Sequence, residues 1–289
     1  RGSRHMAAAS SLVRLEHCLC VVADDELYLG VFPGEGDGPG YAIQILDGEM
    51  PADDSERKTD KPDLEACVLL PGNESHPHGS ILILGSGSGE ARNAGALVPL
   101  TEPDRPSNEH LKVDLLPLFN ALRQEIHGLN IEGAAVQGPS LFLLQRGDAA
   151  GSRDARIELD LAAVQRSLLN DRAIDPGAIV GIRTYDLGAI RGVPLTFSDM
   201  SPLEDGRIVF SASAEDSSGS SDGAIAGSAL GVFDTTGDIA WIEPVELRTK
   251  IEGSTARLSS DGIEVLMVID DDNPDSPTPL LATTLPTYP

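Results

Sequence analysis

The sequence is poor in cysteine, in aromatic side chains and in positive charge. Its 289 residues include 3 cysteines, and 4% of them are aromatic. Three thiols cannot form a structural zinc site, which needs about four spaced ligands. Cys18 and Cys20 lie in a strand-like run where residues two apart share a face, so they cannot easily bond to each other. With Cys67 they are three thiols without a disulfide framework, which is typical of a reducing cytoplasm.

Positive charge is scarce as well. The 21 Lys and Arg residues face 46 Asp and Glu residues, which gives a formal net charge of -25. A surface of this sign repels phosphate backbones and anionic membranes, so we expect the protein to bind neither nucleic acid nor membranes. Two interpretations of the acidity are open. Either it serves solubility alone, or some carboxylates gather around a cation.

Long apolar runs and leader signals are absent too. The sequence has no apolar run of about 18 residues, so no transmembrane helix is predicted. No signal peptide is visible, and we expect a cytoplasmic protein, or a periplasmic one if a signal peptide has been removed. Residues 1–6, RGSRHM, resemble an expression-tag remnant. Residues 7–289 are predicted to form one domain, and we expect a monomer.

What the chain does contain is a repeat. Five hexamers begin with apolar or small residues and end at a polar one, at 19–24, 81–86, 141–146, 208–213 and 265–270. This pattern is typical of a buried strand that runs out into a loop. A third strand is expected after each hexamer, at 26–32, 94–100, 154–161, 227–234 and 279–285. A fourth strand is expected in the first four units, at 41–46, 111–116, 179–187 and 238–247.

A further strand precedes each hexamer, and these strands begin alike. Their first residues are Glu65, Glu132, Asp199 and Glu252, with Ser10 in the first unit, and the tripeptide IEG occurs twice. Such units predict an all-β protein, a five-bladed β-propeller with mostly four-stranded antiparallel blades. The outer strand that the last blade lacks can come from the N-terminus, which would close the ring.

Two segments lie outside this ring, and two other folds are alternatives to it. Apolar spacing predicts short helices in the connections, at 116–128 and 159–171. A six-bladed propeller with one degenerate blade needs a sixth hexamer, which the sequence does not show. A pair of β-sandwiches does not explain the repeated strand starts. The five-bladed propeller is therefore the prediction.

The topology of a propeller places the repeated carboxylates at one end of the central channel. The first strand of each blade lines the channel and the second returns antiparallel, so the start of one and the end of the other share a face. Glu65, Glu132, Asp199 and Glu252 are therefore expected around one channel mouth. The loops on the same rim supply further polar residues, namely Asp24, Asp25, Ser86, Ser88, Arg146, Glu215, Asp216, Asp270, Asp271 and Asp272.

Four carboxylates around one axis repel one another. At an effective dielectric constant near 20, each pair about 6 Å apart costs on the order of 3 kcal/mol. Either some carboxylates are protonated or a hard cation binds among them, and oxygen ligands favour Ca²⁺, with Mg²⁺ second. Nearby Lys and Arg side chains can instead neutralise the ring without a metal. The four carboxylates are the predicted metal ligands, and the predicted ligand contacts are Asp24, Lys61, Arg92, Asn93, Arg146, Glu215, Lys250 and Asp270.

The remaining motifs are weaker. The loop GSGSGEARN lacks the GK[ST] of a phosphate loop, and we expect it to bring Arg92 and Asn93 to the rim. DDDNPDSP lacks the glycine and the terminal glutamate of an EF-hand. His76 and His78 are expected in a solvent-exposed turn. The sequence has no G-x-S-x-G, and spacing assembles no Ser-His-Asp arrangement.

Several motifs together resemble a known family. They are KPDLEA, GSGS…ARN, LNIEGAAV, SAED…DG…GSALGVFD and KIEG, and they cover almost the whole chain. The sequence is similar to an uncharacterised bacterial β-propeller family, a domain of unknown function, which is itself distantly similar to the SdiA-regulated and esterase-like phytase propellers. The resemblance implies a propeller and, from the distant relatives, a calcium ion near the channel mouth. It implies no established activity.

The residues leave more than one function open. The first is a binding module that holds a divalent cation, a small polar ligand, or both at its acidic mouth. The second is a metal-dependent hydrolase of ester, lactone or phosphoester bonds, in which Glu65, Glu132 or Glu252 acts as base. A scaffold that binds another protein on the disc face is a third. The sequence alone does not decide whether the protein is an enzyme.

Overall fold

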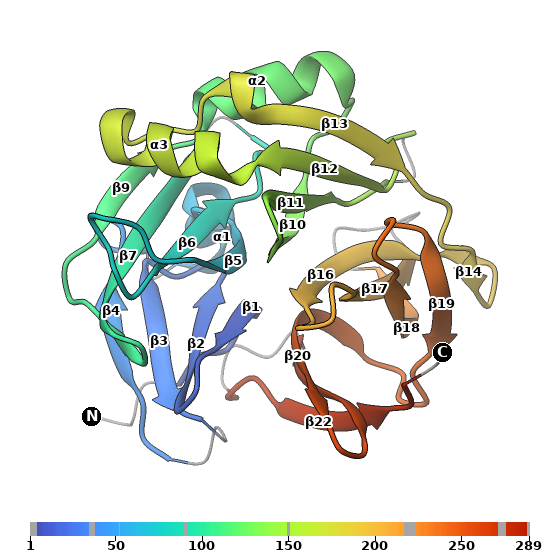
Figure 1. Cartoon of the computed structure of the whole chain (residues 1–289). Coiled ribbons are helices and arrows are strands. Elements are labelled where there is room, and N and C mark those ends of the chain that lie inside the picture. The colour runs from blue at the N-terminus through green and yellow to red at the C-terminus, as the bar shows by residue number, and fades with distance from the viewer. Residues whose placement is uncertain are drawn as a thin grey trace.

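The predicted five-bladed β-propeller is confirmed by a computed structural model. It describes residues 5–34, 38–51, 53–89, 92–148, 151–216, 223–270 and 276–287. Each blade is an antiparallel sheet whose strands follow the chain outward from the centre (Figure 1). Blade 1 consists of β1 (Ala9–Arg14), β2 (Cys18–Ala23), β3 (Tyr28–Pro33) and β4 (Tyr41–Gln44). Blade 2 consists of β5 (Leu64–Leu70), β6 (Ser80–Gly85), β7 (Ala94–Glu102) and β9 (Leu111–Asp114).

The other three blades follow the same plan. Blade 3 consists of β10 (Ile131–Gln137), β11 (Ser140–Gln145), β12 (Ala155–Asp160) and β13 (Ile179–Thr184). Blade 4 consists of β16 (Thr196–Pro202), β17 (Ile208–Asp216), β18 (Ala224–Phe233) and β19 (Ile239–Pro244). Blade 5 consists of β20 (Lys250–Ser259), β21 (Gly262–Asp270) and β22 (Leu280–Leu285). Short strands β8 (Arg105–Pro106), β14 (Ala189–Ile190) and β15 (Val193–Pro194) form small hairpins with their neighbours.

The hexamers are the second strands of the blades. In β2, β6 and β11 every residue is buried. Both faces of a blade pack against neighbouring blades, so a central strand is apolar on both faces instead of alternating. This is why the hexamers were readable as continuous apolar runs.

The ring closes by contact between the first and last inner strands. The inner strands β1, β5, β10, β16 and β20 each contact the next, and β20 contacts β1. The predicted outer strand from the N-terminus is wrong within the described residues, because blade 5 has only the three strands β20, β21 and β22 there. The N-terminal segment binds the chain before β22 instead. The Thr278 amide donates to the Met6 carbonyl at 2.8 Å, and the Thr278 hydroxyl donates to the Ala7 carbonyl at 2.6 Å.

Of the three α-helices in the described residues, two were predicted. α2 (Leu116–Glu125) and α3 (Leu161–Asp171) lie over the outer edge of blades 2 and 3 in Figure 1, and the short 3₁₀ helix η2 (Pro176–Ala178) follows α3. α1 (Asp54–Asp60) was missed, because its polar sequence DSERKTD has no apolar period. Its N-cap Asp53 accepts from the amides of residues 55 and 56, which is a side-chain cap.

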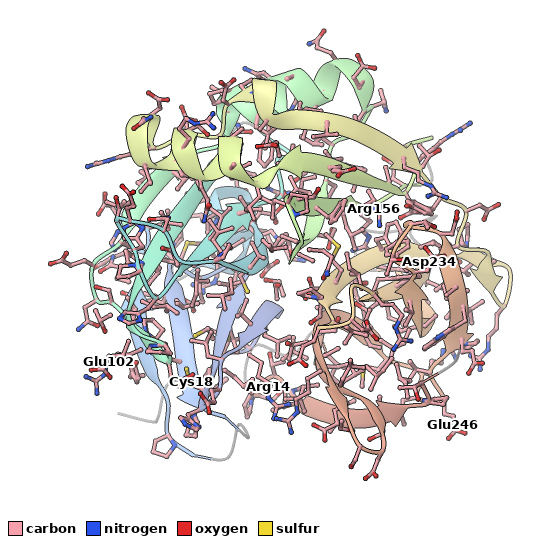
Figure 2. The ribbon with its side chains drawn as sticks, viewed as in Figure 1. Arg14, Cys18, Glu102, Arg156, Asp234 and Glu246 are labelled. Carbon is pink, nitrogen blue, oxygen red and sulfur yellow. The ribbon has the colours of Figure 1, made fainter. Side chains whose placement is uncertain are left out.

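An aromatic cluster of blade 4 packs against blade 3. Phe197, Phe210 and Phe233 pack together with centroid distances of 4.5 to 5.9 Å. The guanidinium of Arg156, which Figure 2 labels, lies 4.4 Å from the Phe142 ring of blade 3 and 5.2 Å from the Phe233 ring of blade 4. Among the described residues, none of the helices has the length and apolarity of a membrane span.

Candidate ligand site at the channel mouth

Every inner strand carries a β-bulge near its start. The pairing with the second strand shifts by one residue at the same point in all five blades. A bulge inserts one unpaired residue and re-aims its side chain. The bulged residues are Ser10, Glu65, Glu132, Ser198 and Glu252. The repeated carboxylate of the sequence is therefore the bulge residue of blades 2, 3 and 5.

Asp199 lies one residue beyond the bulge, so it is not the counterpart of the three glutamates. Its carboxylate is 1% exposed and accepts from the Ser254 amide at 2.8 Å, the Met200 amide at 2.8 Å and the Ser11 hydroxyl at 3.2 Å. These bonds join β16 to β20 and to β1. Burial raises the pKa of Asp199 well above its usual range. Gly133 leaves room for this side chain, because a Cβ there would lie 3.0 Å from Asp199 Oδ1.

The layer around Asp199 separates two parts of the channel. On the far side is a mainly apolar cavity of about 500 Å³, lined by residues of all five inner strands. On the near side is the mouth that carries the bulge glutamates. The two ends of the channel therefore differ, and the predicted glutamates lie only at the near end.

One half of the mouth is a chain of alternating charges. Arg146 Nη1 lies 3.4 Å from Glu132 Oε1, and Arg146 Nη2 lies 3.0 Å from Glu215 Oε2. Lys250 Nζ lies 3.3 Å from the same Glu215 oxygen and 2.7 Å from Glu252 Oε1. This chain links the bulges of blades 3 and 5 through the blade 4 strand β17. It neutralises part of the ring without a metal, as the sequence allowed.

The other half of the mouth is centred on Asp63. Lys61 pairs with Asp24 and lies 2.8 Å from Asp63 Oδ1, and Arg92 Nη1 lies 3.0 Å from Asp63 Oδ2. Ser86 and Ser88 also donate to Asp63 Oδ2. Although burial opposes it, Lys61 lowers the pKa of Asp63, helped by Ser86 and Arg92. Asp63 is thus held as an anion.

Glu65 is the carboxylate without such support. In the described part of the chain its side chain has no hydrogen bond and no ion pair, although one oxygen lies within 4.8 Å of oxygens of Asp24 and Asp63. Burial, and then the nearby Glu132, Asp24 and Asp63, raise the pKa of Glu65 well above its usual range. The carboxylates of the two halves outnumber the four Lys and Arg side chains by two. When all of them are ionised the mouth carries excess negative charge, which either protonation or an added cation would relieve.

A protein-family model matches residues 5–285 and is described as a family of unknown function (DUF6929). The chain belongs to this family. No curated protein matches the sequence at a significant level. The family membership agrees with the resemblance noted in the sequence, and it carries no activity.

Solved structures that resemble this family member are β-propellers of low sequence identity. The α-L-arabinanase of Penicillium chrysogenum, solved with arabinobiose, has a TM-score of 0.47 and 11% identity, and the match covers 97% of this chain and 83% of that one. The WD40 propeller domain of Doa1 has a TM-score of 0.39 and 12% identity, with 98% and 84% covered. A luciferin-regenerating enzyme has a TM-score of 0.43 and 9% identity, with 98% and 78% covered. These likenesses concern the fold alone.

The structure brings most of the predicted residues together, but not all. Asn93 lies away from the mouth, where it accepts a hydrogen bond from Arg123 at 2.7 Å. Asp25 pairs with Arg57 of α1 at 2.5 Å. The side chain of Asp270 and all of Asp271 and Asp272 lie outside the described residues. Asp63 was missed, although its position two residues before Glu65 was a usable signal.

A cavity adjoins the mouth of this family member on the side of blades 3 and 4. Its volume is about 1050 Å³, in the range of ligand pockets. Arg92, Arg146 and Glu215 of the mouth form one wall. Its other polar lining residues include Ser88, Asn130, Asp148, Ser152, Arg153, Asp154, Thr184, Tyr185, Asp186 and Thr196. A polar molecule in this cavity would contact the charged mouth directly.

Glu132 gives the protein a pH-dependent stability. Burial raises its pKa from 4.5 to about 7, against the opposing effect of Arg146. Because the folded pKa is the higher one, the folded state binds the proton more tightly and stability falls as pH rises from about 4.5 to 7. We expect a loss on the order of 3 kcal/mol across this window. Asp154, whose pKa burial raises to about 6, acts in the same direction.

Urea unfolding between pH 5 and pH 8 measures this dependence. The Glu132→Gln variant cannot titrate at this position, so its stability should fall less steeply over the same range. Equal slopes for the variant and the parent would contradict the raised pKa of Glu132.

Proposed function

We propose that this protein is a binding module whose channel mouth holds a divalent cation together with a small polar ligand. The observation that carries the proposal is Glu65, a carboxylate without a partner beside two others. Burial and then repulsion by neighbouring carboxylates raise its pKa, and a further cation at this point would relieve the repulsion. The polar cavity next to the mouth supports the second half of the proposal, because it gives a ligand access to the same residues.

The residues fit a hard cation in their chemistry. Asp24, Asp63 and Glu65 offer carboxylate oxygens within 4.8 Å of one another, and no sulfur or imidazole belongs to this set. Oxygen-only ligands are those of Ca²⁺ and Mg²⁺, and Ca²⁺ tolerates the more irregular geometry. Lys61 already lies between Asp24 and Asp63. A cation would therefore bind on the Glu65 side of this cluster, in competition with the Lys61 ammonium.

A bound cation would supply an electrostatic anchor for an anionic or hydroxyl group of the ligand. The chain itself supplies the orientation. Arg146 is fixed by Glu132 and Glu215, and Arg92 is fixed by Asp63 and Ser88. Both line the cavity, so they present guanidinium groups in defined positions.

Thermal melts test the cation half of this proposal. A ligand that binds only the folded state raises the melting temperature, so the protein should melt higher in excess Ca²⁺ than in EDTA. Melts in an equal concentration of Mg²⁺ and in NaCl of equal ionic strength control for divalent preference and for ionic strength. A melting temperature that is the same in EDTA and in Ca²⁺ would count against a bound cation.

A second candidate function is supported by Glu132. With a pKa of about 7, this carboxyl is suited to act as a general base near neutral pH, and its partner Arg146 lines the cavity. A cation at the mouth would lower the pKa of a bound water. Hydrolysis of an ester, lactone or phosphoester is the reaction class that these groups suit.

A hydrolase screen in the presence of Ca²⁺ tests this second candidate. We expect the Glu132→Gln variant to lose about 10²-fold or more of any activity found, because a general base contributes about that factor. The Glu246→Gln variant, altered at an exposed glutamate, is the matched control. Equal activity in the two variants would remove Glu132 from the mechanism.

A further inference from the structure

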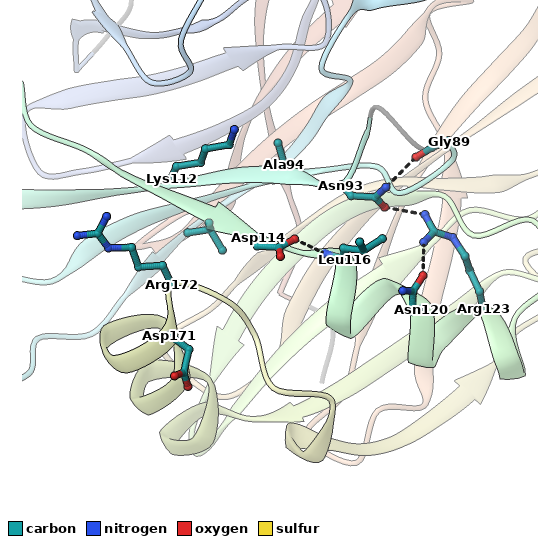
Figure 3. Close-up of a pocket in the computed structure, with 11 residues that line it drawn as sticks. Gly89, Asn93, Ala94, Lys112, Asp114, Leu116, Asn120, Arg123, Asp171 and Arg172 are labelled. Carbon is teal, nitrogen blue, oxygen red and sulfur yellow. Dashed lines mark hydrogen bonds between the residues drawn. The ribbon is translucent and has the colours of Figure 1, made fainter.

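A second large pocket lies at the outer edge of the molecule, away from the channel mouth. Its volume is about 1050 Å³, and it is lined by β9, by α2 and by the chain that follows α3 (Figure 3). Three of its lining residues are the cations Lys112, Arg123 and Arg172. Three cations of a protein with 21 Lys and Arg residues against 46 Asp and Glu residues therefore meet at this pocket.

Within the part of the chain that the structure describes, no carboxylate forms an ion pair with the cations of this pocket. Arg123 is held by neutral acceptors, donating to the Gly87 carbonyl at 2.6 Å, to Asn93 Oδ1 at 2.7 Å and to Asn120 Oδ1 at 3.2 Å. Within the described ranges, Lys112 and Arg172 have no side-chain hydrogen bond or ion pair. Arg123 is thus fixed in place with its charge uncompensated, which is how a preorganised oxyanion contact is built.

Arg172 stands in a backbone conformation that favours glycine. It ends α3 with φ 53° and ψ 36°, in the left-handed region. Glycine is the usual residue at such a helix end, and a side chain there is strained. The position is held by the backbone, since the Asp114 amide donates to the Arg172 carbonyl at 2.8 Å. A long cationic side chain at this point gains nothing locally, so it is a candidate for a role in binding.

The pocket also contains two carboxylates, and they shape what can bind. Asp114 lies between the cations in Figure 3, and its Oδ1 accepts from the Leu116 amide at 2.9 Å. In the same view Lys112 and Arg172 lie on one side of Asp114 and Arg123 on the other, and Asp171 points away from Arg172. An anion at either end therefore meets positive charge, whereas the middle is negative.

We propose that this pocket binds a small molecule that carries two separated oxyanion groups, one at Arg123 and one at Lys112 and Arg172. The two ends can be carboxylates or phosphates, because both groups accept the same hydrogen bonds from guanidinium and ammonium donors. This site is separate from the channel mouth, and it does not depend on the function proposed there.

Isothermal titration of the full chain tests the site. The probes are succinate and pyrophosphate, with acetate as the single-anion control, in metal-free buffer at constant ionic strength. We expect at least one of the two dianions to bind about tenfold or more tightly than acetate, and to weaken as salt is raised. Binding of succinate alone points to a dicarboxylate, and binding of pyrophosphate alone to a diphosphate. If neither dianion binds better than acetate, the proposal is wrong.

The Arg172→Gly variant separates binding from stability. Glycine suits the left-handed position, so its melting temperature should equal or exceed that of the parent. Its affinity for the dianion should fall about tenfold. Arg166→Gln, which removes an exposed cation from α3 outside the pocket, should leave the affinity unchanged within twofold. Lys112→Gln is the second test variant should Arg172→Gly fail to fold. Equal affinity in the pocket variant and in Arg166→Gln would overturn the proposal.

Discussion

Replacing Asp199 with alanine should cost this protein about 3–5 kcal/mol of folding free energy. The side chain is 1% exposed and accepts three hydrogen bonds that join three of the five inner strands. Removing it leaves the amides of Ser254 and Met200 buried without acceptors, and each such group costs about 1–3 kcal/mol. The cavity left by the carboxylate adds to the loss.

Urea unfolding at pH 7 measures this effect as a lower midpoint. Asp47→Ala is the matched control, because Asp47 is exposed and has no hydrogen bond in the described part of the chain. It should change stability by about 0.5 kcal/mol at most. Asp199→Asn keeps one acceptor oxygen but presents an amide to a backbone donor. Its stability should therefore lie between those of Asp199→Ala and Asp47→Ala. If Asp199→Ala were as stable as Asp47→Ala, Asp199 would not be the residue that fastens the inner strands.

Replacing Glu65 with glutamine should weaken Ca²⁺ binding by about tenfold or more while leaving the fold intact. Among the described residues, the substitution removes a mouth carboxylate that has no hydrogen bond or ion pair, and a lost charged ligand is a large part of a Ca²⁺ site. Because burial raises the pKa of Glu65, a neutral side chain of the same shape relieves repulsion in the cation-free protein. The variant in EDTA should therefore melt at the same temperature as the parent or higher.

The Lys61→Met substitution should change Ca²⁺ affinity in the opposite direction. The Lys61 ammonium lies with Asp24 and Asp63, where it competes with an added cation. Its removal should strengthen Ca²⁺ binding in a titration of the variant against the parent. A weaker affinity in Lys61→Met would mean that the cation, if bound, lies elsewhere. Arg166→Gln, which removes an exposed positive charge elsewhere, controls for the change in net charge.

Most of the fold was predictable because each blade repeats one simple pattern. Continuous apolar hexamers mark second strands, since these are buried on both faces, and all five were found. The helices α2 and α3 have apolar spacing and were also predicted. Helix α1 was missed because it is polar throughout and held by the Asp53 cap. The N-terminal closure was misjudged because hydrogen bonds between residues 6–7 and Thr278 leave no sequence pattern.

The candidate site was predictable at the level of strand starts but not of single residues. The IEG repeat identified the strand starts at Glu132 and Glu252, and Glu65 was identified as the acidic residue that begins the apolar run EACVLL. In blade 4 the acidic residue is shifted by one position, so Asp199 was placed at the mouth instead of in the layer that closes the channel. A shift of one residue turns a side chain from one environment to another in a strand, and composition alone does not show it. Asn93 was misplaced because it follows a loop whose direction the sequence does not fix.

The most direct measurement is equilibrium dialysis of the purified protein against Ca²⁺ up to about 1 mM, the weak end of protein Ca²⁺ sites. Metal analysis then gives the number of ions per chain. We expect a bound Ca²⁺ ion in the parent protein that Glu65→Gln loses and Glu246→Gln keeps. No bound Ca²⁺ in the parent, or equal binding in the two variants, would contradict it.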